Sequence, residues 1–162
     1  MTAKRRTILI GMTAGVLWAL AVVFAPMLLA LPYLPAPLAL PGAFLAPGLV
    51  LAAMIARLAA RRFFDDALID GAAAAPGSRA EIDQRVLHNT LEQLLLALAI
   101  WPFAALTLGG AVAIALGLSF ALMRVLFWIG YHLSPPLRAL GFAGTFYPTV
   151  LAGIWALLYW MF

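Results

Sequence analysis

Cysteine is absent from this sequence of 162 residues, and charged side chains are scarce. Without cysteine there can be no disulfide, no thiolate metal site and no cysteine nucleophile. Charged residues make up 10% of the chain, against roughly a quarter in a soluble domain, whereas 66% of the residues are hydrophobic. Such a chain cannot cover itself with polar surface. The composition therefore excludes soluble globular, disordered and fibrous proteins and predicts an all-α integral membrane protein.

Long stretches without charge predict five membrane-spanning helices. A span needs about 20 apolar residues, and the charge-free run at 7–56 is long enough for two. Four prolines at 32–41 interrupt this run, since proline removes backbone donors. We expect helices at about 7–31 and 43–62, from Arg79 to the break at Gly109-Gly110, at 111–133, and at 139–162. Removal of the first segment as a signal peptide, or its placement in the interface, remains an alternative with four spans.

The ionisable residues gather at or toward one end of these expected helices. The loops expected at the other end, 32–42 and 109–110, carry no charge. The positive-inside rule therefore predicts an inner, cytoplasmic membrane with the N-terminus and the polar loop 63–84 in the cytoplasm. The rule also accounts for the net charge of +4, so we expect no nucleic-acid partner. In this loop, Ser78 and Glu81 have the spacing of a capping box at the start of the third helix.

One face of the third expected helix carries polar residues at helical spacing: Arg85, His88, Asn89 and Glu92. Glu92 would lie about 10 Å deeper than Arg85. A carboxylate at that depth is costly unless it is paired or faces a polar cavity. His88 and Glu92 are too few to hold a metal ion, so we expect no metal site.

The fourth expected helix supplies a cation at similar depth. Arg124 is followed by Tyr131 and then by Arg138, in steps of seven residues. We expect Glu92 and Arg124 to form an ion pair or to share a ligand, with Arg138 closing the pocket beyond the helix end. One alternative is a buried Arg–Glu pair that only links the two helices and binds no ligand. A polar pocket for a small anionic or zwitterionic ligand would instead account for all these residues.

This pattern resembles the MAPEG family, the membrane-associated proteins in eicosanoid and glutathione metabolism. The pattern consists of Arg85-x-x-x-Asn89-x-x-Glu92 followed by Arg124, Tyr131 and Arg138. The resemblance implies a four-helix bundle over 43–162, with 1–42 as an additional N-terminal helix and outer loop. It also implies a homotrimer that binds glutathione, as co-substrate, between subunits near the cytoplasmic face.

The resemblance implies a role for each residue of the pattern. Arg85, His88, Asn89, Glu92, Arg124 and Tyr131 would bind glutathione. Arg138 would be catalytic, because a permanently charged guanidinium favours the thiolate. The thiolate would attack a lipophilic electrophile or hydroperoxide that arrives from the membrane lipid. Ala139 stands where the prostaglandin synthase has a serine, which argues against that isomerase chemistry.

Two other functions remain open at this point. The chain could be a non-catalytic protein of the same fold that binds a lipid or a partner. It could also be a small oligomeric transporter in which Glu92 and Arg124 couple transport to ion movement.

Overall fold

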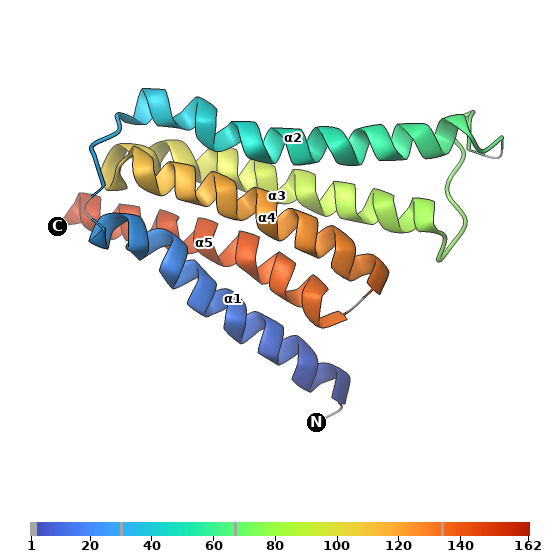
Figure 1. Ribbon diagram of the computed structural model, residues 1–162, viewed down its shortest axis with the longest axis horizontal. Helices are drawn as coiled ribbons and strands as arrows, with labels where there is room; N and C mark the ends of the chain where they lie inside the picture. The colour runs from blue at the N-terminus through green and yellow to red at the C-terminus, as the bar shows by residue number, and fades with distance from the viewer. Residues whose placement is uncertain (1–2, 30, 67, 134) are drawn as a thin grey trace.

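The computed structural model describes residues 3–29, 31–66, 68–133 and 135–162. These residues form five α-helices and no strand (Figure 1). The helices are α1 (Ala3–Leu28), α2 (Ala36–Phe63), α3 (Arg79–Leu108), α4 (Gly110–Leu133) and α5 (Pro135–Met161). Each is long and apolar enough to cross a membrane. The chain is thus an all-α integral membrane protein, and the predictions of this fold class and of five spans are confirmed.

Two helices begin earlier than the prolines suggested. We expected α2 from 43 and α5 from 139, but they start at Ala36 and Pro135. Proline is tolerated in the first turn of a helix, where its missing N–H would have no partner in any case. Pro41 and Pro47 lie farther inside α2, and Pro26 lies inside α1. The break between the first two helices is therefore shorter than predicted.

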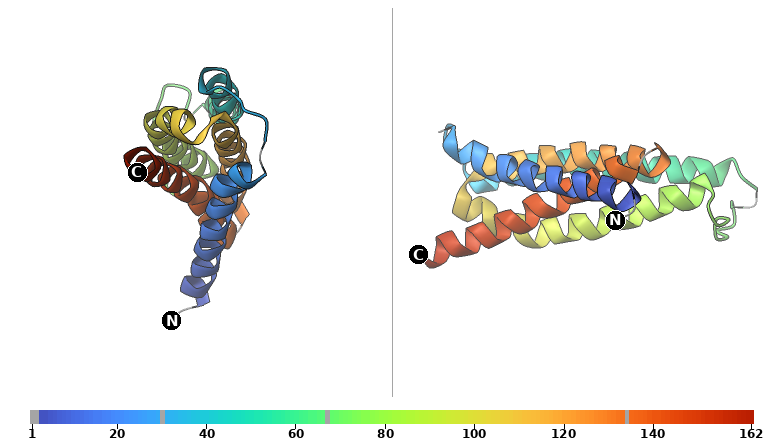
Figure 2. Two further views of the ribbon diagram at one scale, coloured as in Figure 1. Left: turned by 90° about the vertical axis from the view of Figure 1, so that its left-hand side faces the viewer. Right: turned by 90° about the horizontal axis from the view of Figure 1, so that it is seen from below.

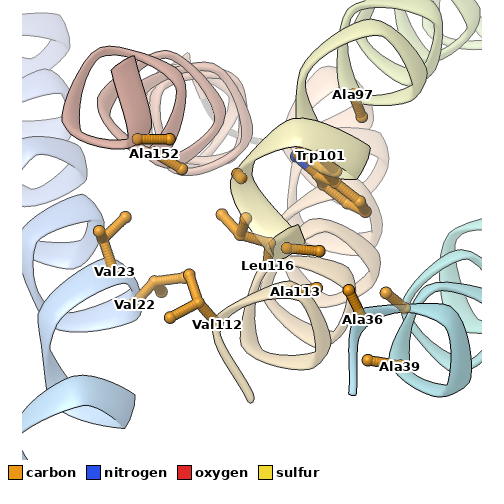
Figure 3. Packing of buried hydrophobic residues seen from close by; sticks show 14 of the residues in the cluster. Val22, Val23, Ala36, Ala39, Ala97, Trp101, Val112, Ala113, Leu116 and Ala152 are labelled. Atoms are coloured by element: carbon orange, nitrogen blue, oxygen red, sulfur yellow. The ribbon is translucent and has the colours of Figure 1, made fainter. Parts of the chain in front are cut away.

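Helices α2 to α5 pack side by side, and α1 lies along α5 and α4 (Figures 1 and 2). The buried core contains many alanines around a few large side chains, of which Trp101 is the largest (Figure 3). The Trp101 ring stacks with Phe44 at 5.1 Å and meets Phe120 edge-on at 5.8 Å. Its Nε1 donates a hydrogen bond of 3.2 Å to the Thr149 hydroxyl. Small residues let helices approach closely where hydrophobic driving force is weak.

α1 is an integral part of the bundle. Gly11 and Gly15 lie directly against α5, so that a Cβ at Gly15 would come within 2.4 Å of the Ala143 Cβ. The Trp18 Nε1 donates a hydrogen bond of 2.7 Å to the Ser119 hydroxyl on α4. Farther along, Phe24 meets Trp155 edge-on at 5.2 Å. The spacing of Gly11 and Gly15 is the small-x-x-x-small pattern of packed membrane helices, which was readable in the sequence.

A single residue outside both helices connects α3 to α4. Gly109 has a φ of +97°, which only glycine adopts readily. Its N–H donates to the Ala105 carbonyl, and the Gly110 N–H donates to the Leu34 carbonyl, each at 3.1 Å. At the other end of α3, the Ser78 hydroxyl accepts from the Glu81 N–H at 3.2 Å. The Glu81 carboxylate accepts from the Gly77 N–H, one residue before the position of a standard capping box.

Candidate functional site

The predicted polar residues of α3 lie on one face of the helix and form ion pairs and hydrogen bonds within that helix. Arg85 Nη2 lies 2.7 Å from a Glu81 carboxylate oxygen, and His88 Nε2 lies 3.4 Å from one of Glu92. The Asn89 amide donates a hydrogen bond of 3.1 Å to the other Glu92 oxygen. The Glu92 side chain is 55% exposed and that of His88 is 79% exposed. Among the described residues no third ligand joins these two into a group that could hold a metal ion.

Arg124 is the most deeply buried cation of the site. It is fully buried between α3 and α5. Its Nη1 donates a hydrogen bond of 2.9 Å to the Asn89 amide oxygen, and its Nη2 donates to the Thr145 hydroxyl. Asn89 thus stands between Arg124 and Glu92, so the direct Glu92–Arg124 ion pair, one of the two predicted alternatives, is wrong, and a ligand shared by the two residues stays a prediction. Depth alone suggested the pair, but Glu92 lies on the exposed side of α3.

Neutral groups surround the Arg124 charge. The guanidinium carbon lies 4.4 Å from the centre of the Phe127 ring and 5.6 Å from that of Phe120. The Nε atom has no hydrogen-bond partner in the described part of the chain. A buried cation without a paired carboxylate is costly, and an anionic ligand nearby would reduce that cost.

A cavity of about 470 Å³ opens beside this network. Its walls include three of the predicted site residues, Asn89, Tyr131 and Arg138. The Arg138 guanidinium lies over the Tyr131 ring, 5.0 Å from its centre, and Tyr131 meets Phe127 edge-on at 5.0 Å. Arg138 makes no ion pair with a carboxylate of the described residues. Arg138, Asn89 and two tyrosines, Tyr131 and Tyr147, therefore line one hollow. Its other lining residues are apolar: Ile8, Met12, Phe127, Ala139 and Phe142.

Two more of the predicted residues line a second hollow, whereas Glu92 and Arg124 line neither of the two. This hollow of about 450 Å³ is lined by Arg85 and His88, together with Glu81 and Gln84. Asn89 lines both hollows. The structure therefore divides the predicted site: Asn89, Tyr131 and Arg138 share one cavity, and Arg85 and His88 line the adjacent one.

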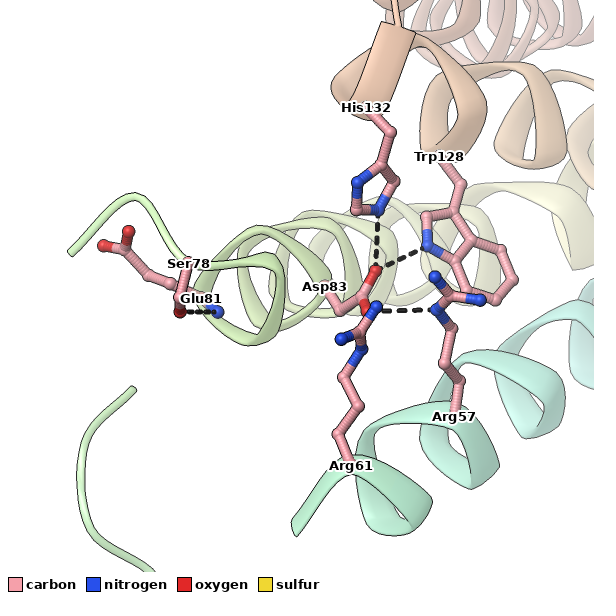
Figure 4. Close-up of polar contacts among 7 residues, drawn as sticks. All are labelled: Arg57, Arg61, Ser78, Glu81, Asp83, Trp128 and His132. Atoms are coloured by element: carbon pink, nitrogen blue, oxygen red, sulfur yellow. Dashed lines mark hydrogen bonds and ion pairs between the residues drawn. The ribbon is translucent and has the colours of Figure 1, made fainter. Parts of the chain in front are cut away.

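A second polar cluster, centred on Asp83, was not predicted as a unit (Figure 4). Its carboxylate accepts from Arg57 Nε at 3.0 Å and from Arg61 Nε at 2.6 Å. Trp128 Nε1 donates to the other carboxylate oxygen, which also lies 2.9 Å from His132 Nε2. The Asp83 side chain is only 2% exposed. The cluster thus joins the ends of α2 and α4 to the start of α3.

The sequence contains a signal for this cluster. Asp83 shares a helical face with Val86, Thr90 and Ala97, all of which are buried. An acidic residue on the buried face of a membrane helix needs partners. In the sequence, the arginines of α2 indicated only the orientation of the chain, so their pairing with this carboxylate was missed.

Comparison with known proteins gives a family assignment. No curated protein and no solved structure matches the chain. The model of the MAPEG family matches residues 36–158, from the start of α2 into the last turns of α5, and leaves α1 outside. The match covers most of the chain, including the three helices α3, α4 and α5 that carry the pattern of polar residues. The chain therefore belongs to the MAPEG family of membrane proteins in glutathione and eicosanoid metabolism.

Proposed function

We propose that this protein is a glutathione-dependent membrane transferase or peroxidase. The observation that supports it best is the cavity in which an unpaired Arg138 faces Asn89 and Tyr131. The cavity volume of about 470 Å³ lies within the range of about 300–1,000 Å³ of small-molecule sites. Glutathione would supply a thiol that, once ionised, attacks an electrophilic carbon or a hydroperoxide oxygen.

The residues on the walls suit a peptide with carboxylates. Asn89 presents an amide whose orientation is set by its bonds to Arg124 and Glu92. Arg124 places an uncompensated charge behind that amide, which favours an anion in the cavity. In this proposal Arg85 and His88, on the adjacent hollow, would bind the far end of the tripeptide, since Asn89 lines both hollows.

Arg138 would favour the ionised thiol. A guanidinium remains charged at all physiological pH values, and a cation near a thiol lowers the pKa of that thiol. The Tyr131 ring beneath it limits the positions that the guanidinium can take. The apolar lining would exclude water from the reacting atoms and accept the hydrocarbon part of an electrophile.

The exposed polar face of α3 supports assembly into an oligomer. Glu92 is 55% exposed in a helix that crosses the membrane. An ionised carboxylate in contact with lipid is costly, so this face needs a polar cover. Neighbouring copies of the chain, arranged as a homotrimer, would provide that cover and complete the binding site between subunits.

The charge distribution supports a location in the cytoplasmic membrane with the N-terminus and the site toward the cytoplasm. Because the chain has no cysteine, single cysteines can report this topology. An impermeant maleimide should label Ala74→Cys only in permeabilised cells and Tyr33→Cys also in intact cells. The reverse pattern would contradict the orientation. Along the chain, we propose that residues 1–42 are an added N-terminal segment and that residues 43–162 form the glutathione-binding bundle.

The function is tested with purified protein and Arg138→Ala. Native mass spectrometry with glutathione should show three subunits and bound tripeptide. We expect Arg138→Ala to lower the rate of glutathione conjugation by about 100-fold while glutathione affinity falls only a few-fold. Removal of one group that stabilises a reacting anion typically lowers the rate by about that factor. Wild-type protein that binds a lipid but never turns over a thiol-reactive electrophile would instead support a non-catalytic binding protein. Flux in liposomes that depends on Glu92 would support a transporter.

A further inference from the structure

The cavity has one wall that the family does not provide. Ile8 and Met12 line it, and both belong to α1, which precedes the matched residues 36–158. They are four residues apart and therefore lie on one face of the helix. Asn89 and Arg138 line the same cavity. The cavity thus receives polar side chains from α3 and α5 and two apolar side chains from α1.

α1 is held firmly enough to act as a wall. Gly11, between Ile8 and Met12, lies so close to α5 that a Cβ there would come within 2.8 Å of the Pro136 carbonyl oxygen. Gly15 packs against Ala143 one turn later, and the Trp18–Ser119 hydrogen bond anchors α1 to α4. The close packing of Gly11 and Gly15 against α5 therefore fixes the part of α1 that carries Ile8 and Met12.

The other face of α1 is open. Leu9 and Leu17 are 54% and 65% exposed, and neither lines the cavity. In a membrane these side chains would meet lipid. α1 thus contributes Ile8 and Met12 to the cavity and, in a membrane, presents Leu9 and Leu17 to lipid; Met12 is itself 41% exposed and lies at the edge of the cavity.

We propose that α1 selects the lipophilic substrate: Ile8 and Met12 bind its hydrocarbon chain and limit the length that fits beside Arg138. This inference rests on the proposed function. An unbranched alkyl chain suits this lining, because Met12 is flexible and Ile8, Ala139 and Phe142 are apolar. The substrate class is therefore an electrophile at the end of an alkyl chain, such as a 2-alkenal.

The test measures kcat/KM for glutathione with 2-alkenals of increasing chain length. The thiolate sulfur adds to the β-carbon and a proton from water goes to the α-carbon, so no leaving group complicates the series. We expect Met12→Trp to lower kcat/KM for the longest alkenals by about 10-fold relative to the shortest, since loss of pocket space for a few methylenes has that effect. Met12→Ala should shift the preference toward longer chains. Leu17→Trp is the control and should retain the wild-type profile.

A binding measurement covers the case in which Met12→Trp fails to fold. In the cysteine-free chain, S-dodecylglutathione should protect Met12→Cys from N-ethylmaleimide, whereas S-methylglutathione, which has no long alkyl chain and no free thiol to consume the reagent, should not. Leu17→Cys should react equally with and without either compound. If Met12→Trp conjugates glutathione with the wild-type chain-length profile, or if Met12→Cys reacts equally under all conditions, the proposed role of α1 is overturned but the proposed function is not. Wild-type protein that binds neither compound would overturn the proposed function together with it.

Discussion

The Arg124 guanidinium donates a hydrogen bond to Asn89, and Asn89 donates one to Glu92. One side-chain amide therefore links a buried cation on α4 to an exposed carboxylate on α3. The amide uses its oxygen toward Arg124 and its nitrogen toward Glu92. A side chain that only donates or only accepts cannot make both bonds.

Replacing Asn89 should therefore lower the free energy of unfolding by more than the small size of its side chain suggests. Asn89→Leu has a similar shape but leaves the Arg124 Nη1 without its acceptor inside the protein. We expect a loss of about 1–3 kcal/mol in unfolding free energy, the typical cost of an unsatisfied buried donor. Glu92→Gln is the matched control, since its carbonyl oxygen can still accept from the Asn89 amide. Thermal unfolding in detergent checks both, and equal stability of the two variants would contradict the bridging role of Asn89.

Asp83 should be the carboxylate whose charge matters most for stability. Asp83→Asn keeps the shape but weakens the bonds from Arg57, Arg61 and Trp128. We expect a loss of about 1–3 kcal/mol, toward the lower end because both arginines are partly exposed and can bind water instead. Asp70→Asn, at an exposed position of the loop, should leave the unfolding temperature unchanged. A wild-type unfolding curve for Asp83→Asn would show that the cluster is not stabilising.

The aromatic ring of Tyr131 should matter more than its hydroxyl for the position of Arg138. Tyr131→Phe retains the ring under the guanidinium and should conserve most of the conjugation rate. Tyr131→Leu removes the ring and should lower kcat/KM by about 3- to 10-fold, the value of a partly buried cation–π contact. If Phe and Leu lower the rate equally, the hydroxyl rather than the ring carries the role.

The hydrogen bond between α1 and α4 should contribute measurably to stability. Trp18→Phe removes the donor to Ser119 and keeps most of the packing. We expect a loss of about 0.5–1.5 kcal/mol, in line with hydrogen bonds between membrane helices. Trp160→Phe is a suitable control, because Trp160 is exposed at the end of α5. Similar unfolding temperatures for the two variants would exclude a stabilising Trp18–Ser119 bond.

The sequence was sufficient to predict the membrane-spanning helices. In lipid the backbone polar groups of a long charge-free run must bond within the run, and an α-helix achieves this. The polar face of α3 also followed from spacing alone. The partner of Arg124 did not, since counting residues estimates depth but not the direction in which a helix faces its neighbour. Asn89 and Glu92 lie within one turn of α3, and packing decides which of them Arg124 meets.

The start of α2 was missed for a different reason. Prolines in the stretch 32–41 predict a break, but the same residues are compatible with a first helical turn. The packing of Ala36, Ala39 and Ala43 into the core favours the helix. Local preference left two possibilities, and tertiary contacts selected one.

The one-residue connection at Gly109 has a consequence for how this chain can vary. An α-helix advances about 100° and 1.5 Å per residue, so an inserted residue that joins α4 at its start would rotate the rest of α4 by that angle relative to α3. Arg124 would then face away from Asn89, and Trp128 away from Asp83. The turn sets the rotational phase between the two helices, and both polar networks should lose their registration together if its length changes.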